Sequence, residues 1–212
     1  EQGHAESQYQ LALLYERGDG VPKDPIETVA WLQRAAAQDH ANAQQLLGEK
    51  FASGEGVPKN NSEAIKWFRK AAESGSVAAQ SNLGFMYATG AGVEKNLTEA
   101  ASWFRKSADA GNAVGQLNLG LLFQSGQGTE QNFPEAAKWY EQAANKKHAL
   151  AQQNLATLYA NGQGVEQDLG KAGQIKRGHA AWAEVTPRGF DGLFDPFGSA
   201  VIAMGNAIAP PD

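Results

Sequence analysis

The sequence predicts an all-α solenoid in which antiparallel helix pairs repeat every 36 residues. Two observations support this prediction. Pairs of glycines separated by one residue recur 36 positions apart, at Gly18/Gly20, Gly54/Gly56, Gly90/Gly92, Gly126/Gly128 and Gly162/Gly164. Three other columns keep the same register: Gln8, Gln44, Gln80, Gln116 and Gln152; Leu11, Leu47, Leu83, Leu119 and Leu155; and Tyr15, Phe51, Tyr87, Phe123 and Tyr159. Such a period is the signature of stacked helical repeats.

The first helix of each repeat, called helix A, is expected at about residues 5–17 of the first repeat. Small or apolar residues recur at the positions equivalent to 5, 8, 11, 12 and 15, a spacing that places them on one side of a helix. The first glycine of each pair follows directly. It suits a left-handed residue that ends the helix.

The second helix, called helix B, is expected to begin after a polar N-cap: Asp24, Asn60, Asn96, Asn132 or Asp168. In the first four repeats a glutamate stands three residues later, which predicts a capping box. Trp31, Trp67, Trp103 and Trp139 recur within helix B. Tryptophans can stack on sugars or bases, but their regular recurrence near alanine pairs favours packing between repeats as core residues.

The composition excludes several kinds of partner and site. The net charge is -5, and no basic run is interleaved with aromatic residues, so nucleic acid is not an expected partner. The longest weakly polar stretch, residues 199–209, is too short for a membrane helix, so no membrane insertion is expected. There is no cysteine, and His4, His40 and His148 fall in separate repeats, so neither a metal site nor a cofactor is expected.

No phosphate loop, zinc-protease motif or serine-nucleophile motif occurs, so the sequence predicts no catalytic residue and a protein that is not an enzyme.

The pattern A-x-x-Q-x-x-L-G-x-x-[FY]-x-x-G-x-G-V-x-x-[DN]-x-x-E-A-x-x-W-[FY]-x-[KQ]-[AS]-A is legible, with small deviations, in residues 41–72, 77–108 and 113–144. It resembles the Sel-one-like repeat family, relatives of tetratricopeptide repeats. The resemblance implies a right-handed superhelix that serves as an adaptor, and a bacterial protein exported to the periplasm. Some members join each repeat by a disulfide, which this chain without cysteine cannot do.

The ends depart from the pattern. Residues 1–4 are interpreted as the last turn of a preceding, truncated repeat. Five repeats follow over residues 5–184, namely 5–40, 41–76, 77–112, 113–148 and a degenerate 149–184. Residues 185–212 form a non-repeat tail whose Phe190, Phe194 and Phe197 either cover the last repeat or dock on a partner; covering is favoured.

A partner-binding surface is expected on helix A, which lines the concave side of such superhelices. Its variable columns include Asn82, Asn118 and Asn154, whose carboxamides could hydrogen-bond an extended peptide. Phe85 and Leu121 would supply pockets, and Leu13, Glu49 and Tyr9 complete the predicted surface. The alternative is that each asparagine bonds an adjacent helix.

The sequence therefore predicts a non-catalytic adaptor that holds a protein or peptide on the concave helix A face. One alternative is an inhibitory or toxin-neutralising binding protein. Another is an enzyme acting on the cell wall, on peptidoglycan or β-lactams. The last would require ionisable residues that converge in the groove, and the sequence displays no such set.

Overall fold

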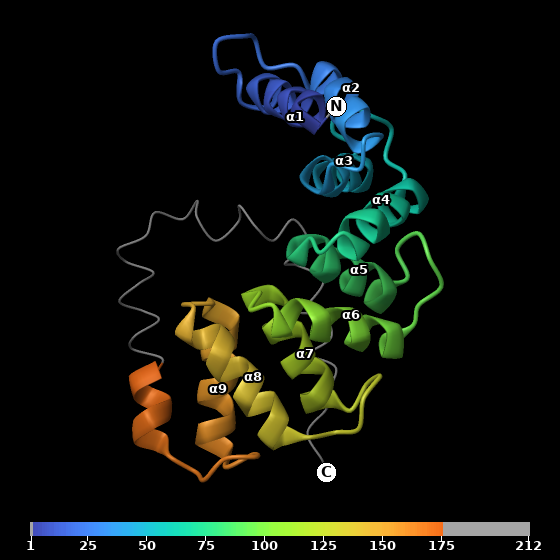
Figure 1. The fold of residues 1–212 in the computed structure, drawn as a ribbon. Helices are drawn as coiled ribbons and strands as arrows, with labels where there is room; N and C mark the ends of the chain where they lie inside the picture. Colours follow the sequence, from blue (N-terminus) through green and yellow to red (C-terminus); the bar gives the residue numbers. More distant parts are fainter. Residues whose placement is uncertain (1, 176–212) are drawn as a thin grey trace. The chain divides into compact units, whose positions relative to one another are not determined.

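The computed structural model describes residues 2–175, in which helices are joined by short loops and no strand occurs (Figure 1). The A helices are α1 (Gln2–Arg17), α3 (Ala41–Ser53), α5 (Val77–Thr89), α7 (Ala113–Ser125) and α9 (Ala149–Asn161). The B helices are α2 (Pro25–Ala36), α4 (Asn61–Glu73), α6 (Leu97–Asp109) and α8 (Phe133–Asn145), and residues 169–175 are again helical. This order confirms the predicted all-α fold of helix pairs repeating every 36 residues.

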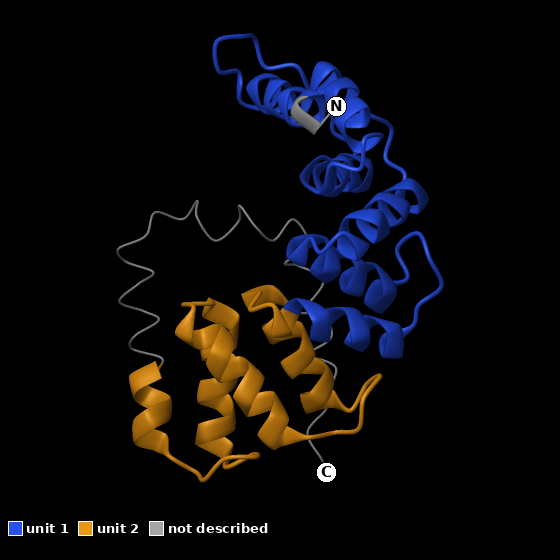
Figure 2. Ribbon diagram, in the orientation of Figure 1, with its two compact units in different colours: residues 1–107 blue, residues 108–212 orange. Residues whose placement is uncertain are grey.

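The chain divides into two compact units, residues 1–107 and 108–212 (Figure 2). In unit 1, α1 packs on α2, α2 on α3, α3 on α4 and α4 on α5. In unit 2, α7 packs on α8 and α8 on α9. The helices α2, α3, α4 and α8 therefore each pack against both the helix that precedes and the helix that follows.

The helix ends follow the predicted signals. Gly54 ends α3 in the left-handed region, with φ of 86°, and its N–H donates to the carbonyl of Lys50. At the start of α4, the side chain of Asn60 accepts a hydrogen bond from the N–H of Glu63. Equivalent caps begin α2, α6 and α8.

The predicted capping box is only half present. The N–H of Asn60 donates to the carbonyl of Phe51 at the end of α3, instead of meeting the Glu63 carboxylate, which pairs with Lys66. The same bond joins Asp24 to Tyr15 and Asn96 to Tyr87. Because the preceding helix already supplies an acceptor, the cap needs no reciprocal carboxylate.

The glutamine column joins successive repeats. The carboxamide nitrogen of Gln44 donates to the carbonyl of Ala36, at the end of the preceding helix B. Gln80, Gln116 and Gln152 make the same bond to the carbonyl eight residues earlier. Each of these carbonyls also accepts a backbone N–H from the turn that follows helix B, so the glutamine adds a second donor and stabilises the packing of one repeat on the next.

The tryptophan column is buried in only one of its four repeats, at Trp139, which corrects the sequence interpretation for the other three. Trp31, Trp67 and Trp103 are half-buried, whereas the following residue in each case is at most 2 % exposed: Leu32, Phe68 and Phe104. A cationic side chain lies over each tryptophan ring, at 4.2 Å for Arg34 on Trp31. Trp67 still packs against the apolar cluster of the first two repeats. Trp31, Trp67 and Trp103 therefore lie at the edge of the core, whereas Trp139 belongs to it.

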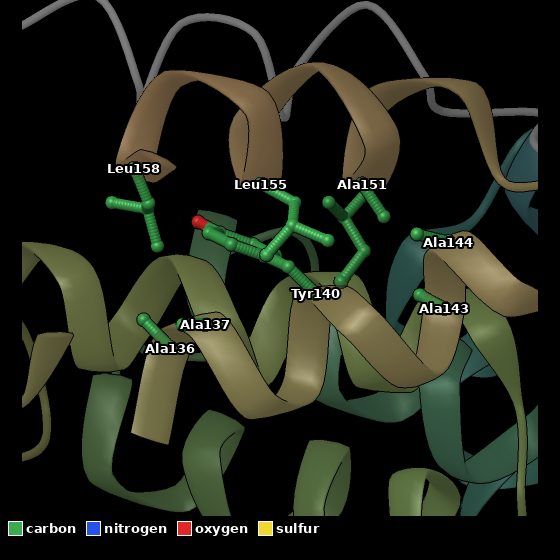
Figure 3. Packing of buried hydrophobic residues seen from close by; sticks show 9 residues of the cluster. Ala136, Ala137, Tyr140, Ala143, Ala144, Ala151, Leu155 and Leu158 are labelled. Atoms are coloured by element: carbon green, nitrogen blue, oxygen red, sulfur yellow. The ribbon is translucent and has the colours of Figure 1, made fainter. Parts of the chain in front are cut away.

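Unit 2 shows how the core is filled. Tyr140 of α8 is fully buried, and Ala151, Leu155 and Leu158 of α9 lie against it, with Ala143 beside them on α8 (Figure 3). The small alanine side chains allow the two helix backbones to approach, while the ring of Tyr140 fills the space between them.

Residues 2–4, interpreted from the sequence as the last turn of a preceding repeat, are the first residues of α1 in the structure. In later repeats the helices are separated by a turn whose N–H groups bond carbonyls of the previous helix B, as Asp39 does with Ala36.

Two predictions concern residues that the structure does not describe. The tail residues Phe190, Phe194 and Phe197, and the last part of the fifth repeat from residue 176, lie outside the described residues.

Within residues 2–175 no helix is long and apolar enough to cross a membrane, and no group of three potential metal-ligating side chains occurs.

Candidate binding surface on the A helices of unit 1

The exposed side of the A helices in unit 1 carries a row of half-buried side chains that we call the helix A face. It consists of Tyr9 and Leu13 of α1, Leu46 and Glu49 of α3, and Asn82 and Phe85 of α5. Tyr9 and Leu46 pack against one apolar cluster, and Asn82 contacts Glu49 directly. Five of the six were predicted from the sequence; Leu46, which occupies the same column as Asn82, was missed as a site residue.

Glu49 lies at the centre of a polar network on this face. Its Oε1 accepts hydrogen bonds from Gln45 Nε2 at 3.2 Å and from Asn82 Nδ2 at 3.3 Å. Gln45 Oε1 in turn accepts from the Ser76 hydroxyl at 2.9 Å. Asn82 therefore bonds the adjacent helix A, which is the alternative that the sequence left open for this column.

Burial raises the pKa of Glu49 above its ordinary value, with neutral side-chain donors and Lys50 only partly opposing the effect. Lys50 itself is buried and occupied elsewhere. Its Nζ lies 2.7 Å from Glu16 Oε1 and 2.7 Å from Glu55 Oε2. Within the described part of the chain Glu49 takes part in no ion pair.

Tyr9 is held in place at the edge of the face. Its ring lies on the imidazole of His40, with 4.8 Å between the centroids. Both ring nitrogens of His40 have partners: Nδ1 accepts from the N–H of Ala43, and Nε2 lies 2.9 Å from Glu6 Oε2. Burial, then the nearby Glu6 carboxylate, raise the pKa of Tyr9. The ring therefore presents a fixed aromatic surface.

The candidate residues of unit 2 serve the fold. Asn118 is only 6 % exposed, and its Nδ2 donates to the carbonyl of Val114 in its own helix. Asn154 hydrogen-bonds the buried hydroxyl of Tyr140, and Leu121 packs against the core of the unit. The carboxamide of Asn118 is buried and bonded within its own helix, so it is not available to a partner, whereas Asn154 and Leu121 are half-buried. Burial of Asn118 could not be read from the sequence of its column.

The chain was compared with known families and structures. The Sel1 repeat model matches residues 5–40, 41–76, 77–112, 113–148 and 149–174. No curated protein matches the chain.

Two similar solved structures share more than a third of the aligned sequence. One is c5321, a protective antigen present in uropathogenic Escherichia coli strains, with 36% identity and a TM-score of 0.82 over 85% of this chain. The other is a Sel1 repeat protein from Oxalobacter formigenes, with 35% identity and a TM-score of 0.79 over 84% of this chain. The chain spans 39% of the first protein's length and 73% of the second's.

A more distant similarity concerns the fold alone: immunity protein Pa5087 from Pseudomonas aeruginosa is 22% identical, with a TM-score of 0.53 over 81% of this chain and 63% of its own. The matched repeats cover residues 5–174 without a gap and agree with the helix pairs of the structure. The chain belongs to the Sel1 repeat family.

Proposed function

We propose that this protein is a non-catalytic scaffold that binds a protein or peptide on the helix A face of unit 1. Sel1 repeats are typically modules of protein–protein interaction. The observation that carries the proposal is the composition of the face. Three successive A helices contribute apolar side chains and one carboxylate, all half-buried and open to a partner.

The B helix α4 of the same unit offers a contrast. On α4 the exposed side chains are all polar, and four of the five are charged: Lys66, Arg69, Lys70 and Glu73, with Ser62 as the fifth. Such a surface is well solvated, and removing it from water brings little apolar gain. The helix A face is therefore the better candidate for a stable contact.

The arrangement of ionisable groups favours binding over catalysis. An acid–base pair, Glu6 and His40, lies beside this face next to Tyr9, but the imidazole uses Nδ1 to cap α3 and Nε2 to contact Glu6. A general base needs a ring nitrogen that can reach a substrate proton. No such nitrogen is left on His40, so the cell-wall enzyme receives no support from this site.

Export from a bacterial cell is part of the proposal, and its support is the family resemblance. Fractionation of cells that express the full-length natural protein would test it. Recovery in the periplasmic or secreted fraction is expected, and recovery in the cytoplasm would contradict export.

The binding proposal is tested by affinity capture from an extract of the source organism, with two matched variants as bait. Leu13→Glu adds a charge to the helix A face, whereas Ser102→Glu adds the same charge to an exposed position of α6. A genuine partner is captured by the wild type and by Ser102→Glu, and is lost with Leu13→Glu. Equal capture by both variants would rule out this face.

Circular dichroism spectra and melting curves of both variants serve as the folding control. Leu13 is half-buried but lies outside the fully buried cluster, so a cooperative melt close to that of the wild type is expected.

A further inference from the structure

We propose that Glu49 recognises a cationic side chain, so that the bound segment presents a lysine or arginine between apolar residues. This inference rests on the proposed function and names the chemistry of its partner. It is carried by the geometry of one carboxylate, its neighbours and the charges around it.

The first observation is that the carboxylate is oriented by neutral groups. Gln45 and Asn82 both donate to Oε1 and so occupy its two lone pairs. Among the described residues none donates a hydrogen bond to Oε2, and this atom is not sealed from solvent. One oxygen is thus fixed by the fold while the other is available to a donor from outside.

The second observation is that the nearest cation is already neutralised. Lys50 is 3% exposed and lies 2.7 Å from carboxylate oxygens of both Glu16 and Glu55. Glu16 also acts on Glu49 and raises its pKa, as a like charge must. The negative charge of Glu49 is therefore only weakly balanced within unit 1, and a half-buried charge of this kind is stabilised by an external cation.

The third observation is that apolar side chains surround Glu49. Leu13 occupies the same column as Glu49 in the preceding repeat, and Phe85 occupies it in the following one. Leu46 stands one helical turn before Glu49, and Tyr9 is near enough for the two groups to interact electrostatically. A lysine or arginine stem can lie on apolar side chains of this kind while its charged end reaches Oε2.

These features also exclude an acidic side chain as the group that Glu49 binds. An acidic side chain near Oε2 would be repelled by Glu49 and by Glu16, the carboxylate that already acts on it. A neutral segment could fill the apolar part of the face but would leave the carboxylate desolvated and unpaired, which costs affinity. The face therefore selects a cation at its centre.

The test is a selection of random peptides displayed on phage, carried out in parallel on three immobilised forms of the whole chain. They are the wild type, Glu49→Gln and, as a matched control, Glu73→Gln on the exposed side of α4. Glutamine at position 49 keeps an oxygen that accepts from Gln45 and Asn82 but removes the charge. We expect a conserved lysine or arginine among peptides selected by the wild type and by Glu73→Gln, and none among those selected by Glu49→Gln.

Binding of the best selected peptide is then measured with its basic residue kept or replaced by a neutral isostere, citrulline for arginine or norleucine for lysine. A charge-assisted hydrogen bond predicts a loss of about tenfold in affinity for the wild type and little loss for Glu49→Gln. Melting curves establish that each form is folded.

The outcomes separate the two proposals. If peptides bind the helix A face, as judged by their loss with Leu13→Glu, but show no basic residue, the inference about Glu49 is overturned and the proposed function stands. If a basic residue is selected equally by Glu49→Gln, the cation is recognised elsewhere and the inference again fails. If no peptide depends on this face, both the inference and the proposed function are refuted.

Discussion

Gly48 of α3 lies so close to Phe68 of α4 that a Cβ at residue 48 would be 2.7 Å from two carbons of the ring. Gly84 has the same relation to Phe104, and Gly120 to Tyr140. The first repeat differs, because the equivalent positions hold Ala12 and Leu32, both fully buried. A larger residue on helix A is thus accompanied by a smaller one on helix B, as close packing requires.

This relation predicts a coupling between residues 48 and 68. Gly48→Ala should destabilise the protein by about 1–3 kcal/mol through overpacking, and Phe68→Leu by roughly 1 kcal/mol or more through lost contacts. The double variant restores the alanine–leucine combination of the first repeat, so its loss should be smaller than the sum. Free energies of unfolding from urea titrations provide the measurement, and strict additivity would contradict the coupling.

The second glycine of each loop pair can be examined with an internal control. A Cβ on Gly56 would be 2.0 Å from the carbonyl oxygen of Pro25 in the preceding helix B, whereas one on Gly20 would meet nothing within 4 Å. Both residues have φ close to 75°, so alanine is strained by the backbone equally at each.

Gly56→Ala should therefore cost about 1–3 kcal/mol more than Gly20→Ala, the excess being the steric part alone. Thermal melts of the two variants compare them directly. Equal melting temperatures would mean that the loop moves away from Pro25 without cost.

The column that contains Leu14 is buried to different extents in different repeats, so its contribution to stability depends on the repeat. Leu14 of α1 is 41% exposed, while its equivalents Met86, Leu122 and Leu158 are at most 3% exposed. Met86→Ala should cost about 2–5 kcal/mol, and Leu14→Ala less than about 1.5 kcal/mol, because little of Leu14 is removed from water. Urea titrations of both variants measure the two losses in the free energy of unfolding. Equal losses would contradict the prediction.

The correction to the tryptophan column has its own test. Phe68→Ala removes a side chain with no exposed surface and should cost about 3–5 kcal/mol, whereas Trp67→Ala should cost less because Trp67 is only half-buried. Melting temperatures measured in one buffer decide between the columns. A greater loss for Trp67→Ala would restore the original interpretation.

The pH dependence of stability should report on Glu49. Burial raises the pKa of this carboxyl above 4.5, the ordinary value, so the folded state holds the proton more tightly than the unfolded state. Stability is therefore lost as the pH rises through 4.5, and the loss is complete above the pKa of the folded state.

Glu49→Gln should match the wild type below pH 4.5 and be more stable near neutral pH, since glutamine carries no charge to desolvate. Urea titrations over a series of pH values measure the difference, with Glu73→Gln as the exposed control. A wild type that is the more stable protein at neutral pH would show that the fold already compensates this charge.

Several features of the site were accessible from the sequence because the repeat compares each residue with its own equivalents. The variable columns of helix A pointed to Leu13, Glu49, Asn82 and Phe85, and Tyr9 was predicted beside them; all five are half-buried on one face. Asn118 belongs to the same column as Asn82 but is buried. The difference arises from how far neighbouring helices cover each repeat, which a column of identical residues does not reveal.

The sequence by itself determined the 36-residue repeat, the order of helices A and B, and the residues at which most of them begin and end. These depend on local chemistry, such as a side-chain cap at Asn60 or a left-handed glycine at Gly54.

Only the tertiary structure decided that Phe68 and not Trp67 occupies the innermost column, that the N–H of Asn60 bonds Phe51, and that Asn82 bonds Glu49. The reason is geometric. Adjacent residues on a helix differ by about 100° in direction, so a small rotation of one helix against the next exchanges which of them faces the core.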